Sequence, residues 1–269
     1  FGGVISGSGV VVQAGTGMTI LIANNTYSGG TTITSGTLIG SATSFGSGAI
    51  TDNTALVIDQ PVDAAFANAI NGTGSFLKRG AGRLDYAGTG TLSGPTTVAA
   101  GLLSANGSLA NSAVTVQSGA TLGGSGTVGA TTIQSGGTVA PGNSIGTLHV
   151  NGAFVQAAGS TYQVEVDPMS NASDLILVNG TASIASSASL SVGKNPPGDY
   201  REGARYTVLT ASGGVTGSYA VTGDTAVSQY LALEEAQDAN NIYLRVARTG
   251  DPATAAQTPN QTQTATGTN

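Results

Sequence analysis

The stretch Val116–Leu122, with the sequence VQSGATL, recurs as IQSGGTV at Ile133–Val139, an offset of 17 in the numbering. A looser copy, VQAAGST, follows at Val155–Thr161, at a further offset of 22. Each copy contains glycine, which turns the chain through positive φ without a steric penalty and so marks a corner. Corners at these offsets are typical of a solenoid in which each repeat forms one coil.

A longer repeat lies upstream of these copies. Ile5–Leu38 matches Ile70–Leu103 without a gap, at an offset of 65. Glycines fall at the same places in the two copies, so the corners that they predict are spaced alike. The matching pairs are Gly7 and Gly72, Gly9 and Gly74, Gly15 and Gly80, Gly17 and Gly82, Gly29 and Gly94, and Gly36 and Gly101.

Between the corners the sequence alternates as short β-strands do. Tyr162, Val164 and Val166 are separated by polar residues, and the same period of two recurs at 148–150, 184–192, 206–208 and 242–246. The stretches 63–70 and 231–239 contain helix formers, but neither is a convincing helix. Short strands could form a sandwich, a barrel or a solenoid, and the repeat spacing favours the solenoid. We predict an all-β, right-handed parallel β-helix (solenoid) with a C-terminal β-hairpin cap, of about 12 coils if each takes about 20 residues.

Composition limits the class of protein. Of 269 residues, 42 are glycine and only 8% are charged, while 39% are hydrophobic and the net charge is −6, so the chain can bury a core and is not of the disordered type. The acidic balance argues against nucleic-acid binding. The absence of cysteine fits export through an oxidising compartment. Because the chain begins with Phe1 and lacks a signal peptide, we interpret it as a segment of a longer protein.

At this point the residues resemble a known family. Asn25–Ile33 followed by Ser35–Leu38 looks like the passenger-associated transport repeat of bacterial autotransporters. Leu77–Leu84 resembles the lead-in of a second copy, which has Pro95 at one glycine position of its pair.

The downstream half resembles the junction module that precedes the barrel of an autotransporter. It begins with Gly137–Leu148, GTVAPGNSIGTL. Further elements follow in order at 159–166, 173–174, 178–182, 206–211 and 213–217, and Tyr230–Leu231 and Tyr243–Val246 would close it. The order and spacing of so many elements make this resemblance specific.

The resemblance implies type V secretion. A C-terminal outer-membrane β-barrel of the same polypeptide would be the partner that carries the passenger, and the junction module would act as an autochaperone. We therefore expect residues 1–136 to be a β-helical stem, 137–247 an autochaperone-like module that caps it, and 248–269 a disordered linker toward the barrel. The expected location is the bacterial cell surface, the outer membrane or the medium, reached through the periplasm.

Elementary physics also favours a folding role. Stacked repeats fold by nearest-neighbour addition, so one stable terminal unit can seed the others. An uncapped end would expose unpaired strand edges that invite aggregation. Because Gly193–Asp199 interrupts the coil pattern, we predict a hairpin turn of the cap there.

Candidate chemistry is sparse. His149 is the one histidine, and its place between Leu148 and Val150 predicts an outward side chain without the partners of a catalytic triad. Glu165 with Asp167 could serve a glycosidase or lyase, but a strand end is the simpler interpretation. We interpret Glu234-Glu235 as a solvated face. The cluster of Lys78, Arg79 and Arg83 could contact an anionic polysaccharide, but we favour a solvated corner.

We predict no catalytic, cofactor-binding or metal-binding residue and no cofactor. The leading hypothesis is a non-catalytic stem and folding module that displays a more N-terminal functional region. One alternative is an adhesin, a class associated with virulence, whose β-helix itself binds host or matrix surfaces. A β-helical polysaccharide-degrading enzyme is the third.

Overall fold

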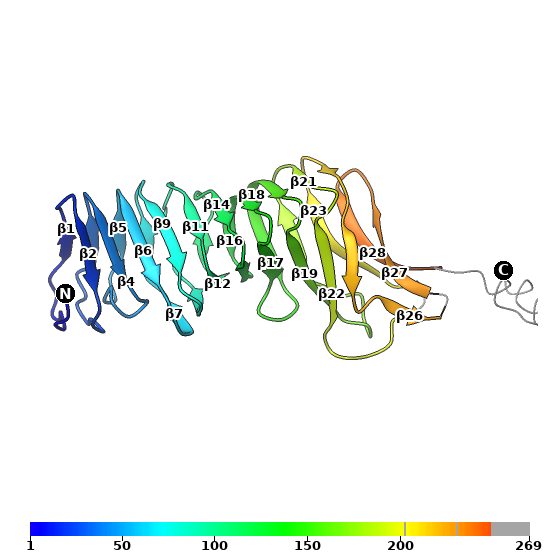
Figure 1. Ribbon diagram of the computed structural model, residues 1–269, viewed down its shortest axis with the longest axis horizontal. Coiled ribbons are helices and arrows are strands. Elements are labelled where there is room, and N and C mark those ends of the chain that lie inside the picture. The colour runs from blue at the N-terminus through cyan, green and yellow to red at the C-terminus, as the bar shows by residue number, and fades with distance from the viewer. Residues whose placement is uncertain (202, 230, 249–269) are drawn as a thin grey trace, which may run out of the picture.

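The computed structural model describes residues 1–201, 203–229 and 231–248. Every regular element in these residues is a strand. The strands stack along one axis into a rod, with the N-terminus at one end and the last described strand at the other (Figure 1). The predicted all-β parallel solenoid is confirmed, since all ladders from β1 to β25 are parallel. None of the described residues forms a helix that could cross a membrane.

Each coil runs along up to three faces of the rod. The first face holds β1 (Val11–Gln13), β3 (Thr31–Ile33), β5 (Ile50–Asp52), β8 (Ile70–Asn71), β13 (Ser108–Leu109), β20 (Leu175–Val178) and β23 (Arg205–Ala211). The second face holds β2 (Met18–Leu21), β4 (Thr37–Gly40), β6 (Ala55–Asp59), β9 (Ser75–Arg79), β11 (Thr96–Val98), β14 (Val114–Val116), β21 (Ala182–Ile184) and β24 (Val215–Thr216). The long strands β16 (Thr127–Ile133) and β18 (Thr147–Gln156) bend across both faces, with a register shift between Gly129 and Thr131.

The third face is a continuous parallel ladder. It holds β7 (Ala64–Phe66), β10 (Arg83–Tyr86), β12 (Gly101–Ala105), β15 (Ala120–Gly124), β17 (Thr138–Pro141), β19 (Thr161–Val166), β22 (Ser189–Lys194) and β25 (Ala220–Gly223). The stretches 63–70 and 231–239, considered above for helix, are strands in β7, β8 and β27.

The coils lengthen toward the C-terminus. From Val114 to its partner Thr131 the numbering advances by 17, whereas from Ile176 to its partner Leu209 it advances by 33. The prediction of about 12 coils is therefore too high, because a uniform coil length does not hold in the second half of the chain.

The short repeat has the predicted register in its first step only. Val116 pairs with Ile133, which confirms the offset of 17. In the next step Ile133 pairs with Gln156, an offset of 23 and not the predicted 22. One residue of slip exchanges the inner and outer sides of a strand, so Val155 is 39% exposed while Gln156 is buried.

The longer repeat does not stack on itself. In its first copy β1 and β2 lie on the first and second faces, and in its second copy the matching β9 and β10 lie on the second and third faces. The same strand–corner–strand unit therefore serves two different corners of the rod. Gly36 and Gly101 keep the same backbone geometry in both, with φ of 70° and 64°.

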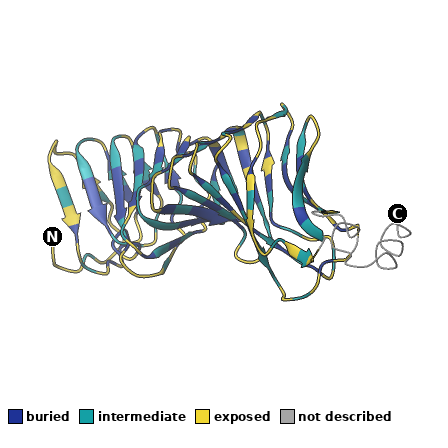
Figure 2. Ribbon diagram, turned by 45° about the vertical axis from the view of Figure 1, so that its right-hand side comes forward, coloured by how far each residue is buried: buried dark blue, intermediate teal, exposed yellow. Residues whose placement is uncertain are grey.

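Every second residue of a strand points its side chain into the interior of the coils, and these side chains form the core. Tyr162, Val164 and Val166 are at most 1% exposed, as the alternation predicts. Figure 2 shows buried and exposed residues alternating along the strands. Phe45, Phe66 and Tyr86 stack in successive coils with ring centroids 6.1 to 6.2 Å apart, which makes an aromatic column inside the rod.

The C-terminal end is closed by antiparallel strands, as predicted. β28 (Asn241–Arg248) pairs antiparallel with β23 and with β27 (Leu231–Gln237), and β26 (Ala226–Ser228) pairs with β27. The hairpin turn predicted at Gly193–Asp199 is wrong, because β22 before it and β23 after it do not pair with each other: β22 pairs with β19 and β25, and β23 with β20 and β28. The turn of the β27–β28 hairpin lies at Asp238–Asn240 instead.

Of the linker expected over 248–269, Arg248 is described, and it is the last residue of β28. Residues 249–269 and Tyr230 lie outside the described part of the chain.

Candidate functional site

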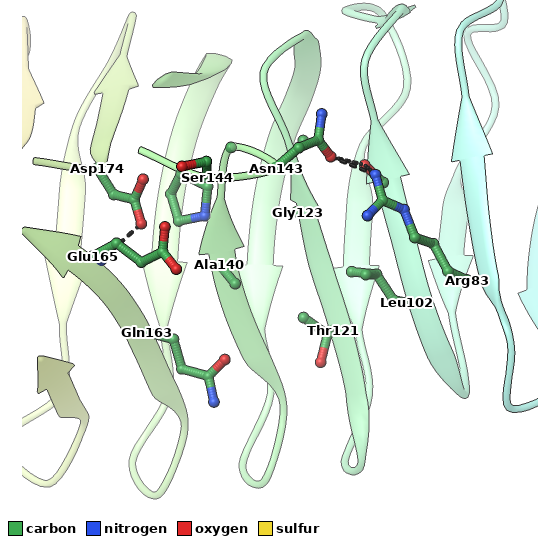
Figure 3. Close-up of a pocket in the computed structure, with 14 residues that line it drawn as sticks. Arg83, Leu102, Thr121, Gly123, Ala140, Asn143, Ser144, Gln163, Glu165 and Asp174 are labelled. Atoms are coloured by element: carbon green, nitrogen blue, oxygen red, sulfur yellow. Dashed lines mark hydrogen bonds between the residues drawn. The ribbon is translucent and has the colours of Figure 1, made fainter. Parts of the chain in front are cut away.

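A groove of about 350 Å³ crosses the outside of the third face. Its floor comes from β12, β15 and β17, through Leu102, Thr121, Gly123 and Ala140. Arg83 of β10 stands at one end and Glu165 of β19 at the other (Figure 3). We call this feature the third-face groove.

One wall of the groove is the loop 142–146, which leaves β17 and folds back over earlier coils. Gly142 has φ of +79°, a conformation that side chains other than glycine rarely adopt. Its N–H donates to the Gly124 carbonyl at 2.8 Å, and the Gly124 N–H donates back at 3.1 Å. The turn at Gly142 therefore directs the next residue toward the N-terminal end of the rod.

Asn143 is held by residues of two earlier coils. The guanidinium Nη2 of Arg83 and the hydroxyl of Ser104, at 2.9 Å, both donate to Asn143 Oδ1. Asn143 Nδ2 donates in turn to Asn106 Oδ1 at 3.0 Å. Arg83 Nη2 also donates to Ser104 at 3.1 Å and lies 3.7 Å from Asp85. This network fixes the wall at its N-terminal end.

Asp174 fixes the other end of the same loop. One carboxylate oxygen accepts from the Gly146 N–H and the other from the Glu165 N–H, both at 2.8 Å. The Asp174 side chain is almost fully buried, and burial raises its pKa to about 7 against the lowering effect of these two bonds. Glu165 accepts from Asn195 Nδ2 at 2.9 Å, and Asn195 also reaches Ser144 at 3.2 Å.

The groove is lined by polar and charged groups, but the described residues contain no group of three or more His, Cys, Asp or Glu side chains that could hold a metal ion. Its charged groups are a cation at one end and carboxylates at the other. Asp174 is an unsuitable catalytic acid, because both its oxygens are engaged by backbone N–H groups.

His149 lies outside this groove, exposed on β18 as predicted. It lines a shallow depression together with Thr127, Leu177 and Asn179. No Asp or Glu lines this depression in the described chain, so the orienting carboxylate of a triad is not supplied there.

Two further carboxylates, Asp167 and Glu235, have structural partners. Asp167 accepts hydrogen bonds from Ser170 and from the Met169 N–H, which hold its pKa below its usual range. Glu235 is not simply solvated, since it accepts from the Tyr219 N–H at 2.6 Å and burial raises its pKa. At the groove the neighbouring carboxylate of Glu165 is Asp174, because both line the groove and Asp167 does not.

The basic cluster forms a solvated corner only in part. Lys78 is fully buried, and its Nζ donates to the carbonyl oxygens of Gly80, Gly82 and Ala100 at 2.6 to 2.8 Å. Arg79 points to the surface, as predicted, and pairs with Asp59 at 2.9 Å. The prediction is wrong for Lys78, because its ammonium group satisfies three backbone carbonyl oxygens inside the corner.

Sequence reasoning missed Asn143 and Asp174. Both lie in segments that carried the family resemblance, but neither the contact of Asn143 with Arg83 nor that of Asp174 with Glu165 has a local signal. The sequence feature that could have indicated the loop 142–146 is the spacing of Gly142 and Gly146.

The C-terminal end has a second buried polar network, formed by tyrosines. The Tyr162 hydroxyl donates to the Val208 carbonyl and the Tyr219 hydroxyl to Gln156 Oε1, each at 2.7 Å. The two rings lie 6.1 Å apart. These bonds join coils that are 46 and 63 residues apart in sequence, just beneath the cap.

Comparison with known proteins adds two findings. The family model of the passenger-associated-transport-repeat matches residues 11–39 and 76–105, which fall on the two copies of the longer repeat. Two relatives from Serratia marcescens, both named extracellular serine protease, are 33% identical over 192 residues and 31% identical over 179 residues. The matches cover 69% and 65% of this chain but 18% and 17% of the relatives, so the chain spans less than a fifth of their length.

Proposed function

We propose that this chain, a β-solenoid of the autotransporter passenger type with two passenger-associated transport repeats, serves as a non-catalytic stem and folding module. In this role residues 1–136 form the stem, and 137–247 form an autochaperone-like junction module. The module supports secretion of the passenger and displays a more N-terminal functional region at the bacterial surface.

The observation that carries the proposal is the closed C-terminal end of the rod. At the C-terminal end β23, β27 and β28 close the stack with antiparallel pairs, and Leu233, Ile242 and Leu244 are at most 3% exposed. A closed, well-packed end is stable without a further neighbour, so it can act as the template on which the next coil forms.

The proposal includes no catalysis by these residues. The names of the two relatives refer to a serine protease, but their matching regions are less than a fifth of their lengths. No Asp or Glu is among the described residues that line the depression around His149. The partner proposed here is an outer-membrane β-barrel of the same polypeptide, with the passenger at the cell surface or released.

Pulsed hydrogen exchange during refolding of the whole chain tests the folding role. Amides of 137–248 are expected to become protected before those of 1–136, because the closed end folds first. Protection of the N-terminal coils first, or of all coils together, would contradict the template mechanism. In cells, deletion of 137–246 is expected to leave the upstream passenger sensitive to protease.

The second candidate is an adhesin whose solenoid binds host or matrix surfaces. The third-face groove is the observation in its favour, since a stem alone needs no walled concavity. Binding of the isolated chain to cells or matrix would distinguish this role from that of a stem.

A further inference from the structure

The third-face groove keeps polar groups free for a ligand. Arg83 uses Nη2 for both of its side-chain hydrogen bonds, and Glu165 uses Oε2 for the bond with Asn195. Arg83 Nε and Nη1, the Gln163 amide and Glu165 Oε1 make no hydrogen bond in the described part of the chain. Gln163 is exposed on β19 and points outward from the groove floor (Figure 3).

The wall of the groove is preorganised. Loop 142–146 is fixed by Asn143 at one end and by Asp174 at the other, with a backbone pair between Gly124 and Gly142. A wall that is already ordered loses little conformational entropy on binding, which favours affinity. A simple connection between β17 and β18 would not need to reach back to Arg83, 60 residues earlier.

The shape of the floor limits the class of ligand. β10, β12, β15 and β17 are each paired on both sides, so these four strands offer no free edge for an extended peptide to join. The lining residues of the described chain include no aromatic side chain and are mostly small or polar. From β10 to β19 the groove crosses four inter-strand gaps, or about 19 Å at the usual strand spacing of about 4.8 Å.

We propose that the third-face groove binds a short acidic oligosaccharide. A sugar carboxylate accepts a hydrogen bond from a free guanidinium nitrogen of Arg83, the one cationic group among the described lining residues. Ring hydroxyl groups then bond to Gln163, Glu165 and the Thr121 hydroxyl along the floor. This binding is independent of the folding role, because the groove lies on the outside of the coils and contributes no core side chain.

Calorimetric titration of the whole chain with trigalacturonate tests the proposal, with maltotriose as the uncharged probe of the same length. Binding is expected for trigalacturonate and not for maltotriose, and it should weaken with added salt. Gln163→Ala removes an exposed amide, and Arg83→Gln removes the charge. Each should lower the affinity about tenfold or more.

A matched pair of tryptophan variants separates the groove from the rest of the rod. Thr121→Trp places a large ring on the groove floor and is expected to abolish binding. Thr115→Trp places the same ring on the outside of the second face in the same coil and should leave binding unchanged. Thermal unfolding of each variant checks that it folds.

Three results would overturn the proposal. They are no measurable binding of trigalacturonate, unchanged affinity in both Thr121→Trp and Gln163→Ala, and equal affinity for maltotriose. The last result would exclude recognition of the sugar carboxylate by Arg83. Because Gln163 is exposed and its amide makes no hydrogen bond among the described residues, its variant keeps the test valid even if Arg83→Gln disturbs the loop.

Discussion

Lys78 Nζ donates a hydrogen bond of 2.8 Å to the carbonyl oxygen of Ala100 in the following coil. Two further bonds to Gly80 and Gly82 close the corner of its own coil. Burial lowers the pKa of Lys78, while Asp59 and Asp63 raise it in part. This single ammonium group therefore joins two coils without a carboxylate in direct contact.

The same corner recurs in the first repeat copy with a glutamine. Gln13, at the position that matches Lys78, donates through Nε2 to the carbonyls of Gly15 at 2.8 Å and Gly17 at 3.3 Å. Gly15 and Gly17 match Gly80 and Gly82. A neutral amide thus fulfils two of the three bonds that Lys78 makes.

We predict that Lys78→Met lowers the free energy of unfolding by about 1–3 kcal/mol, because buried carbonyl oxygens lose their donor. Lys78→Gln should lose less, since Gln13 shows that an amide fits this corner. Urea unfolding of the two variants measures the difference. Equal stability of the methionine and glutamine variants would show that the donor is dispensable.

The stability of the folded chain should fall as the pH rises from about 4 to 8. Burial raises the pKa of Asp52 to about 6 and that of Asp174 to about 7. The folded protein then holds protons that the unfolded chain, with ordinary carboxyl pKa values near 4, releases. The contribution of these two carboxyl groups to the free energy of unfolding is complete below pH 4. It is lost as the pH rises through about 6 for Asp52 and about 7 for Asp174.

Thermal unfolding across this pH range tests that sign. The double variant Asp52→Asn, Asp174→Asn should show a flatter dependence, because an amide does not titrate. Asp59→Asn, at the exposed ion pair with Arg79, is the control and should keep the slope. A wild-type Tm that rises between pH 5 and 8 would show that other groups dominate.

Close stacking of corners makes some glycines sensitive for reasons other than φ. A Cβ at Gly94 would lie 1.8 Å from the Gly74 carbonyl oxygen of the preceding coil, and Gly94 has no positive φ. A Cβ at Gly17 would meet nothing within 4 Å. Gly94→Ala should therefore cost about 1–3 kcal/mol through overpacking, and Gly17→Ala should be close to neutral. Equal unfolding midpoints for the two would contradict this packing argument.

The coils were predictable from the sequence because a glycine corner and a strand leave a local signature. The first step of the short repeat was predicted correctly, but the match of Val155 to Ile133 was off by one. The cause is the extra residue accommodated by the register shift of β16 and β18, which no local pattern marks. The longer repeat, at an offset of 65, was likewise visible in the sequence. Its second copy lies one face further around the rod than the first, because the lengths of the coils between the copies set that position.

The groove was beyond prediction for a different reason. Arg83, Ser104 and Asn143 come from three coils, and their contact requires the exact stacking of all intermediate strands. The cap was more accessible, because its alternation at 242–246 is local. Its hairpin turn was misplaced because Gly193–Asp199 has turn composition, although the strands on either side of it pair with other strands and not with each other.

The folding role makes a kinetic prediction that a merely stable cap would not. Leu244 in the cap and Leu38 in the stem are both at most 1% exposed, so Leu→Ala at either site should cost about 2–5 kcal/mol at equilibrium. If the closed end forms first, Leu244→Ala removes contacts already present in the folding transition state and slows refolding. Leu38→Ala removes contacts that form later, so it should leave the refolding rate nearly unchanged and speed unfolding. Stopped-flow refolding followed by tyrosine fluorescence distinguishes the two, and slower refolding of Leu38→Ala than of Leu244→Ala would place the nucleus in the stem.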